Sequence, residues 1–261
     1  MELGLKGKRV LVTASTKGIG FAIAKTFLKE GARVVISSRN PKNVESALRE
    51  LKNLGEVYGV AADVSSPTQR EELVRRAIEA LGGIDVFVFN SGGPPTKSFI
   101  ETELGDWEAS YRLLLESAVH LTKLILPQMV ERKWGRVVYV TSVAIKMPIE
   151  GLVLSNSVRI GIAGLAKTLV KEFKGSGVTF NVVMPGYTLT KRMEEVLRKS
   201  AQLHGRTFEE ELRELESKIP IGRIGKPEEI ANVVVFLASE AASYVNGEAI
   251  AVDGGLVPTV F

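Results

Sequence analysis

The stretch 9–20 reads RVLVTASTKGIG and joins a short apolar run to a polar turn that contains two glycines. Residues 9–14 predict a buried β-strand, and residues 19–30 predict the helix that follows it. Backbone N–H groups of such a turn, together with the positive end of the helix dipole, can hold a pyrophosphate. Gly18 would let the backbone approach the phosphate, and Gly20 would let the helix pack closely on the strand. The stretch therefore predicts the first strand–turn–helix unit of a dinucleotide-binding sheet.

Short apolar runs alternate with longer helical segments along the rest of the chain. The run Val86–Phe89 reads VFVF, which is typical of a strand buried on both faces of a parallel sheet. This alternation predicts an α/β fold: a doubly wound parallel sheet of the Rossmann type, with about seven strands and helices on both faces. We interpret residues 1–261 as a single dinucleotide-binding domain, because no repeat or linker divides them. The further strands are predicted at 33–38, 56–62, 85–90, 136–141, 178–184 and 249–252, and the further helices at 42–53, 67–81, 103–132, 155–174 and 227–239.

One long segment between Met184 and Pro227 breaks this alternation. It contains the charged amphipathic run 193–218, and a connection of about forty residues is unusual without structure of its own, so we predict two short helices. Ligands of open α/β sheets bind beyond the carboxyl ends of the strands, which is where this segment emerges. We predict a helical substrate lid around 187–220. The alternative is a surface excursion with no role in binding.

The composition excludes several classes of protein. Absence of cysteine rules out disulfides, thiolate catalysis and cysteine metal sites, and the two histidines, His120 and His204, are too few for a histidine-rich site, so no metal is expected. A net charge of +4 is spread along the chain, which does not favour nucleic acid as a partner. Residues 1–8 lack an apolar signal-peptide run, and we expect no stretch of about 18 apolar residues. These features predict a cytoplasmic protein without membrane contact. Rare glutamine, at positions 69, 128 and 202, hints at a heat-adapted source.

The end of the second predicted strand reads Ser37-Ser38-Arg39 and has no acidic residue to hold a ribose 2′-hydroxyl. Lys17 and Arg39 can instead flank a 2′-phosphate, and one such charge pair at ~4 Å is worth roughly 4 kcal/mol before desolvation. The cofactor is therefore predicted to be NADP (NADPH) in preference to NAD, unless Arg39 only points at solvent. Asp63, after the third strand, is expected to face the adenine or else to be a helix N-terminal acid.

The chain resembles the short-chain dehydrogenase/reductase family over essentially its whole length. The closest likeness is to 3-oxoacyl-carrier-protein reductases and sugar dehydrogenases, which implies an oxidoreductase acting on a small carbonyl or alcohol substrate. It also implies a homotetramer built partly on the helices at 103–132 and 155–174. The matching blocks, in order, are Thr13–Gly20, ADV at 62–64, FNSG at 89–92, GRVVYVTS at 135–142, NVVMPGYT at 181–188, PIGRIGKPEEI at 220–230 and VDGG at 252–255.

The family's catalytic residues are an Asn, a Ser, a Tyr and a Lys. Only Ser142 is retained, because Ser155 occupies the tyrosine position, Arg159 the lysine position and Leu114 the asparagine position; Ala14 replaces the first glycine of the turn. A serine hydroxyl is a far weaker acid than a phenol. Arg159 keeps a permanent charge and a fork of donors that can hold ribose hydroxyls. The resemblance thus implies an atypical catalytic centre without the Tyr-x-x-x-Lys pair.

Another residue would then have to supply the proton. One candidate is Tyr187, which follows Pro185-Gly186; the alternative is that its ring merely stacks against the cofactor or the lid. The other candidate is Lys146, which could instead be only a solvated charge on a loop. The alternative function is a dinucleotide-binding pseudoenzyme that acts as a sensor, scaffold or assembly partner. Retention of Ser142, Pro185-Gly186 and Thr188 favours the oxidoreductase. The predicted catalytic residues are Ser142, Ser155, Arg159 and Tyr187, and the predicted cofactor contacts are Ser15, Thr16, Lys17, Gly18, Ile19, Gly20, Ser38, Arg39, Asp63, Val64, Asn90, Gly92, Arg159, Pro185, Gly186 and Thr188.

Overall fold

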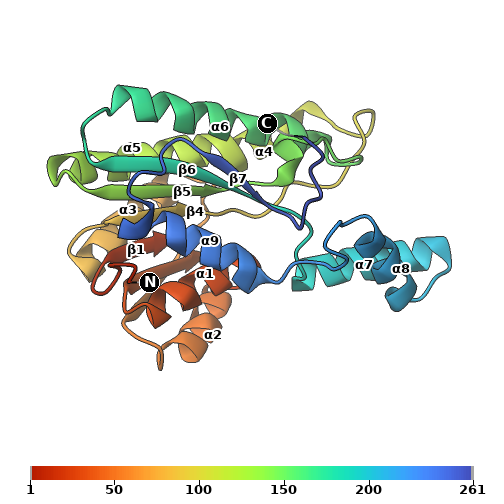
Figure 1. The fold of residues 1–261 in the computed structure, drawn as a ribbon, viewed down its shortest axis with the longest axis horizontal. Helices are drawn as coiled ribbons and strands as arrows, with labels where there is room; N and C mark the ends of the chain where they lie inside the picture. The colour runs from red at the N-terminus through yellow and green to blue at the C-terminus, as the bar shows by residue number, and fades with distance from the viewer. Residues whose placement is uncertain (1, 260–261) are drawn as a thin grey trace.

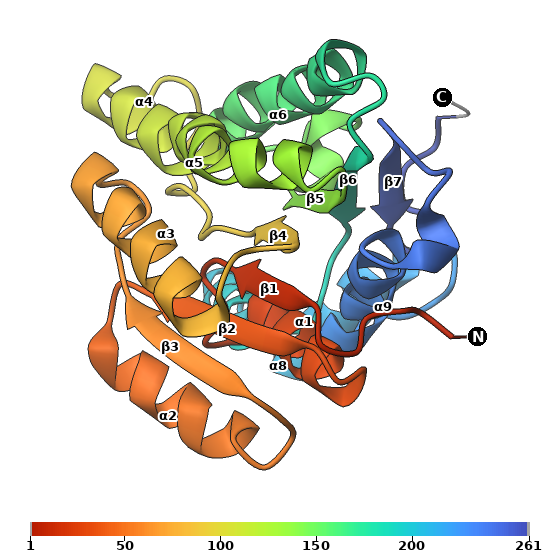
Figure 2. The ribbon, with the colours of Figure 1, turned by 90° about the vertical axis from the view of Figure 1, so that its left-hand side faces the viewer.

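The computed structural model describes residues 2–259, whose seven strands form one parallel sheet between two layers of helices (Figure 1, Figure 2). The strand order is β3-β2-β1-β4-β5-β6-β7, so the chain reverses direction across the sheet between β1 and β4. This is the topological switch point at which open α/β sheets bind ligands. The predicted doubly wound parallel sheet is confirmed. The strands are β1 Arg9–Val12, β2 Arg33–Ser38, β3 Val57–Ala61, β4 Val86–Phe89, β5 Gly135–Val140, β6 Val178–Pro185 and β7 Ala249–Val252.

Two hydrophobic cores lie on the two faces of the sheet. Helices α1, α2 and α9 cover one face, and α3, α5 and α6 cover the other (Figure 2). In β4, Val86 and Val88 belong to the first core, while Phe87 and Phe89 belong to the second. All four side chains are fully buried, as the VFVF pattern predicted. The helices are α1 Gly18–Lys29, α2 Pro41–Leu51, α3 Pro67–Leu81, α4 Leu104–Tyr111, α5 Ser117–Glu131, α6 Val153–Glu172, α7 Lys191–His204, α8 Phe208–Ser217 and α9 Pro227–Leu237.

The prediction of one continuous helix over 103–132 is wrong in the middle of this range. A π-helical turn, Arg112–Glu116, separates α4 from α5 and accommodates an extra residue in the helix. Leu114 at its centre is fully buried. The interruption was not predicted because the apolar spacing of LLLE fits an α-helix equally well. A buried leucine offers no hydrogen bond, so the position of the family's asparagine cannot hold a water molecule here.

Two helical stretches, Leu104–Glu131 and Val153–Glu172, reach a length and a mean hydropathy of 1.2 that would suit a membrane span, although the sequence analysis expected none. Both cover the same face of the sheet, and their inner sides belong to the core on that face. Core helices commonly have this composition. The two stretches therefore give no support to a membrane protein.

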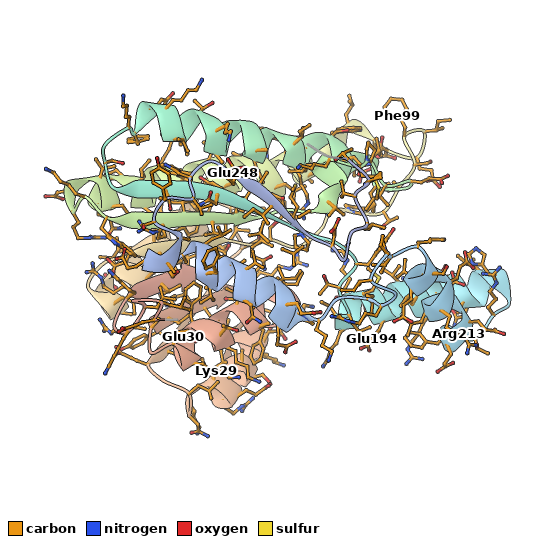
Figure 3. The ribbon with its side chains drawn as sticks, viewed as in Figure 1. Lys29, Glu30, Phe99, Glu194, Arg213 and Glu248 are labelled. Carbon is orange, nitrogen blue, oxygen red and sulfur yellow. The ribbon has the colours of Figure 1, made fainter. Side chains whose placement is uncertain are left out.

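The two helices predicted between Met184 and Pro227 are present as α7 and α8. They form a hairpin that projects beyond the end of β6, at the right of Figure 1. Thr190 caps α7 by accepting a hydrogen bond from Met193 N, and Thr207 caps α8 in a capping box with Glu210. Figure 3 shows the labelled side chains of Glu194 and Arg213 on this hairpin, and Phe99 at the same end of the molecule.

Candidate functional site

A cavity of about 490 Å³ lies where β4, β5 and β6 end and the α7–α8 hairpin begins. Four predicted residues, Ser142, Ser155, Arg159 and Tyr187, line it together. They come from the end of β5, from α6 and from the segment after β6. Residues far apart in the sequence thus meet at the carboxyl edge of the sheet, as the fold class requires.

The glycine turn is held to the end of β4 by hydrogen bonds. Thr13 Oγ1 donates to Asn90 O at 2.7 Å, and Asn90 Nδ2 donates to Ala14 O at 3.0 Å. A Cβ on Gly20 would lie 2.4 Å from Ala14 O, so only glycine fits this helix–strand contact. Ala14 itself adopts φ 47°, a conformation that favours glycine. The turn keeps its shape although its first glycine is replaced.

Ser15 has a structural position within this turn. Its hydroxyl donates to Val12 O at 2.6 Å and accepts from Ser37 N at 3.0 Å, and the residue is fully buried. The side chain therefore joins the ends of β1 and β2. The backbone N–H of Ser15 also donates to Ser37 O, at 2.9 Å, so the predicted cofactor contact of Ser15 has no free donor in this structure.

Ser155 and Arg159 form a buried pair one helical turn apart. Arg159 Nε donates to Ser155 Oγ at 3.1 Å, and its NH2 group donates to the Gly92 carbonyl at 3.2 Å. Each residue is only 6% exposed. Because a guanidinium can only donate, Ser155 uses a lone pair and its own O–H remains free to donate.

Ser142 presents a second hydroxyl in the same cavity. Its Oγ accepts from Ala144 N at 3.2 Å, which again leaves the hydroxyl hydrogen free. Two hydroxyl donors and one buried cation thus border one space. Such a set can bind a carbonyl oxygen and stabilise negative charge that develops on it.

Burial makes the charged form of Arg159 less stable than it would be in water. Burial, and to a smaller extent the positive charge of Arg192, lower the pKa of Arg159 to about 10. The side chain is still protonated at neutral pH. Within residues 2–259, no carboxylate forms an ion pair with it. A buried cation without a counter-ion is typical of a site that receives a polar ligand.

Tyr187 and Lys146, the two predicted proton donors, differ in position. Tyr187 is half-buried and lines the cavity, and in the described part of the chain its hydroxyl has no hydrogen-bond partner. Its backbone carbonyl accepts from Gly225 N at 3.0 Å, which fixes the loop. Lys146 is exposed and lies outside the cavity lining. The geometry therefore supports Tyr187 over Lys146.

A second space of about 380 Å³ lies beside the ends of β2 and β3 and is lined by Arg39, Asp63 and Arg112, among others. Asp63 Oδ1 accepts from both the backbone and the hydroxyl of Ser65, at 2.9 and 2.8 Å, so part of this carboxylate is used within its own turn. Arg39 and Lys17 are both exposed. Arg112 pairs with Glu108 at 2.5 Å and was not predicted.

Comparisons with known proteins identify the family to which the chain belongs. Residues 13–257 match the family model described as Enoyl-(Acyl carrier protein) reductase. The chain is 37% identical to the 3-oxoacyl-[acyl-carrier-protein] reductase FabG of Aquifex aeolicus, covering 98% of this chain and all of the relative. It is 37% identical to the bovine dehydrogenase/reductase SDR family member 4, covering 96% and 88%.

The chain belongs to the short-chain dehydrogenase/reductase family. A solved structure agrees: L-sorbose reductase from Gluconobacter frateurii, complexed with NADPH and L-sorbose, superposes with a TM-score of 0.96 at 32% identity and full coverage of both chains. The family resemblance expected from the sequence motifs is confirmed. This short-chain dehydrogenase/reductase is accordingly an oxidoreductase that acts on a small molecule.

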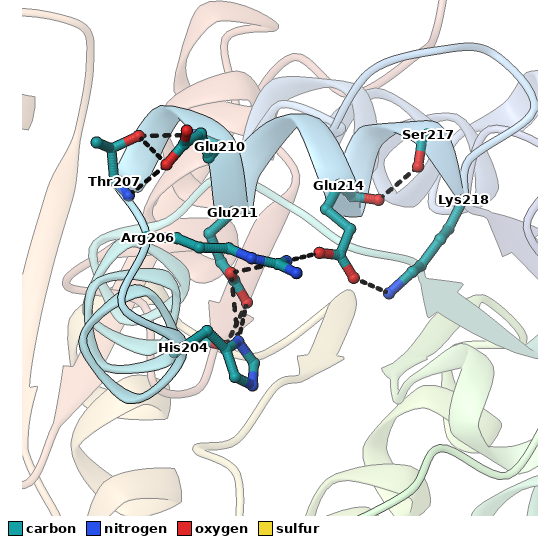
Figure 4. Close-up of polar contacts among 9 residues, drawn as sticks. His204, Arg206, Thr207, Glu210, Glu211, Glu214, Ser217 and Lys218 are labelled. Carbon is teal, nitrogen blue, oxygen red and sulfur yellow. Dashed lines mark hydrogen bonds and ion pairs between the residues drawn. The ribbon is translucent and has the colours of Figure 1, made fainter.

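The α7–α8 hairpin of this short-chain dehydrogenase/reductase is held together by polar contacts, as Figure 4 shows. Glu211, 9% exposed, accepts from Ser200 Oγ at 2.5 Å and contacts His204 Nδ1 at 3.1 Å. Arg206 pairs with Glu214, which also contacts Lys218 Nζ at 3.2 Å. These contacts join the end of α7 to α8.

Arg192, in the first turn of α7, also lines the cavity, and sequence reasoning missed it. Its NH2 group donates to Pro94 O at 3.3 Å, across 98 positions of sequence. No local sequence pattern distinguishes Arg192 from the other lysines and arginines of the α7–α8 hairpin. Its position at the cavity becomes visible only when the hairpin packs against the β4–α4 connection.

Proposed function

We propose that this protein is an NADP(H)-dependent oxidoreductase that interconverts a carbonyl compound and its alcohol through an atypical catalytic centre. The observation that carries the proposal is the Ser155 hydroxyl, held by buried Arg159 and bordering the same cavity as Ser142. The relatives support a 3-oxoacyl- or sugar-like substrate, since they include a 3-oxoacyl-[acyl-carrier-protein] reductase and an L-sorbose reductase.

The residues present fit a nicotinamide dinucleotide. The turn 16–20 offers backbone N–H groups for the pyrophosphate, and space is open next to Gly92, where an added Cβ would meet nothing within 4 Å. Pro185, Gly186 and Thr188 border the cavity from the side of β6, and Arg159 can hold ribose hydroxyls. When bound, the cofactor supplies or accepts a hydride.

The chain's own residues would bind and protonate the carbonyl oxygen. Ser142 and Ser155 donate hydrogen bonds to it, and Arg159 stabilises the negative charge that forms when hydride reaches the carbonyl carbon. Tyr187 gives its proton to that oxygen and recovers one from water. The product is then a neutral alcohol.

The test of this function is NADPH consumption with L-sorbose and with short 3-oxoacyl thioesters as probes. We expect turnover with at least one probe, and a loss of about 10²-fold or more in kcat/KM for Ser155→Ala, because the oxyanion loses a donor. NADPH binding without turnover of any probe would instead favour the dinucleotide-binding sensor, scaffold or assembly partner.

The cofactor preference has its own test. Arg39 borders the space beside β2 and β3, and β2 ends in two serines instead of an acid. Arg39→Asp should therefore weaken NADPH binding about 10-fold or more and leave NADH binding unchanged or stronger, as measured by fluorescence titration. Arg49→Asp on α2, exposed and outside this space, is the control of equal charge change. A parent protein that prefers NADH would contradict the assignment.

We further propose a cytoplasmic homotetramer from a heat-adapted source, built on the outer faces of α4, α5 and α6. Tyr111 and Ile160 are 49% and 54% exposed on these helices, and Gly164 opens onto free space. Exposed apolar groups of this kind favour association of copies. Light scattering on the purified protein measures the mass, and a monomer at micromolar concentration would contradict the assembly.

A further inference from the structure

Arg192 lies against the backbone of the connection between β4 and α4. A Cβ on Gly93 would lie 2.4 Å from the NH1 atom of Arg192, so the guanidinium occupies the place that a side chain would fill there. Its single hydrogen bond within residues 2–259, to Pro94 O, is long at 3.3 Å. The guanidinium is thus held close to the cavity by a weak contact, and it can turn to a better acceptor at little cost.

The charges around the cavity leave two arginines without a counter-ion. Arg159 and Arg192 both line it, and among the described residues neither forms an ion pair. They lie close enough for the charge of Arg192 to lower the pKa of Arg159. Arg159 is buried and Arg192 is exposed, so the charge that lacks both water and a counter-ion is that of Arg159, and an anion bound between the two guanidiniums would offset it.

The carboxylates that border the cavity do not supply that anion. Glu211 is used by Ser200 and His204, and Glu214 by Arg206 and Lys218, all within the lid. Glu150 borders the cavity as well and is exposed to solvent. The protein therefore has an uncompensated positive charge at the inner end of the cavity, next to the Ser155 hydroxyl.

We propose that Arg192, together with Arg159, binds a carboxylate group of the substrate, so that the preferred substrates are oxo acids or hydroxy acids. This inference rests on the proposed oxidoreductase function and adds the substrate class. The planar guanidinium of arginine fits a carboxylate through two parallel hydrogen bonds. Because Arg192 belongs to the first turn of α7, binding the acid would also draw the lid toward the β4–α4 connection.

The cofactor's pyrophosphate is the competing anion, and the packing disfavours it. Thr190, two residues earlier, is the lid residue that lies over the glycine turn: its Cγ2 is 3.3 Å from the place of a Cβ on Gly18. Arg192 lies instead on Gly93 and Pro94, beyond the end of β4. The lid therefore contacts the phosphate-binding turn through Thr190 and the β4 side of the cavity through Arg192.

The experiment measures binding to the protein saturated with NADP⁺, in which a ketone cannot be reduced. Acetoacetate and levulinate are titrated calorimetrically against their methyl esters, which keep the ketone and remove the charge. We expect at least one acid to bind about 10-fold or more tightly than its ester. Arg192→Gln should remove this preference and leave ester binding unchanged, and Arg192→Lys should retain part of it.

Arg198→Gln is the matched control. Arg198 lies on the same helix, with its guanidinium 4.8 Å from the centre of the Phe208 ring, and does not line the cavity. This variant should keep the preference for acids. The proposal would be overturned if the parent bound acid and ester equally tightly, or if Arg192→Gln lost the same factor of affinity for acid and for ester. It would also be overturned if Arg192→Gln bound NADP⁺ more weakly in the absence of acid, because Arg192 would then belong to the cofactor site.

The two proposals can fail separately. Turnover of ketones and esters without any preference for acids would leave the oxidoreductase function intact and remove the carboxylate site. Preferential binding of acids without turnover of any of them would retain the carboxylate site and remove the oxidoreductase function.

Discussion

Replacing Arg159 with methionine should raise the free energy of unfolding of the ligand-free protein by about 2 kcal/mol and weaken NADPH binding at the same time. The folded protein holds the pKa of this guanidinium at about 10, well below its ordinary value, chiefly because the group is buried. A lowered pKa on a base means that the charged form is less stable in the folded state than in the unfolded state. The cost is present at every pH below about 10 and disappears as the pH rises from there through the higher pKa of the unfolded state.

The size of the effect follows from two opposing contributions. The lowering of the pKa of Arg159 to about 10 corresponds to a cost of roughly 3 kcal/mol. Methionine removes this cost. It also leaves Ser155 Oγ and the Gly92 carbonyl without their hydrogen-bond donor, and this loss reduces the gain in stability by about 1 kcal/mol. Denaturation in urea at pH 7 measures the difference.

Arg70 provides the contrast. It is also fully buried, but its NH2 group pairs with Glu116 at 2.5 Å. Arg70→Met would leave that carboxylate unpaired and should lower stability by about 3 kcal/mol, the usual consequence of breaking such a pair. If Arg159→Met were destabilising to the same degree as Arg70→Met, Arg159 would be a structural residue rather than one kept for its ligand.

The sequence predicts much of this fold because its strongest signals are local. The apolar run Val86–Phe89 identifies a strand buried on both faces, and the glycines of the turn mark where the first helix meets the sheet. The charged amphipathic run 193–218 indicates the two helices of the α7–α8 hairpin, which Thr190 and Thr207 cap in the structure. Each of these features depends on residues within a few positions of one another.

The features that were missed depend on distant contacts. The π-helical turn at Arg112–Glu116 inserts a residue without changing the apolar pattern, so periodicity does not reveal it. Arg192 matters because the lid folds back onto Pro94, and the charge of Arg159 matters because no carboxylate within residues 2–259 reaches it. Motif matching predicts that Ser155 and Arg159 occupy the tyrosine and lysine positions, while their hydrogen bond and their burial required the structure.

Tyr187→Phe should reduce turnover by about 10²-fold or more and leave NADPH affinity unchanged. Tyr187 borders the same cavity as Ser142 and Ser155, and its hydroxyl has no hydrogen-bond partner elsewhere in residues 2–259. The two serine hydroxyls can orient the carbonyl oxygen, but a serine hydroxyl is too weak an acid to be the source of the proton. A phenol is a much stronger acid than a serine hydroxyl, so Tyr187 is the better source of the proton.

The phenylalanine variant keeps the aromatic ring and removes only the hydroxyl. Turnover is measured with the best substrate found in the NADPH assay, as a function of pH, and NADPH affinity is measured in parallel. Tyr244→Phe, at a fully exposed position, is the control for the substitution itself and should leave turnover unchanged. If Tyr187→Phe kept the turnover of the parent, the proton would have to reach the substrate from water through the Ser155 hydroxyl, because Lys146 lies outside the cavity. In that case Tyr187→Phe would leave the pH-dependent proton transfer intact, and Ser155→Ala would abolish it. The buried Ser155–Arg159 pair would then carry the proton transfer without a phenol.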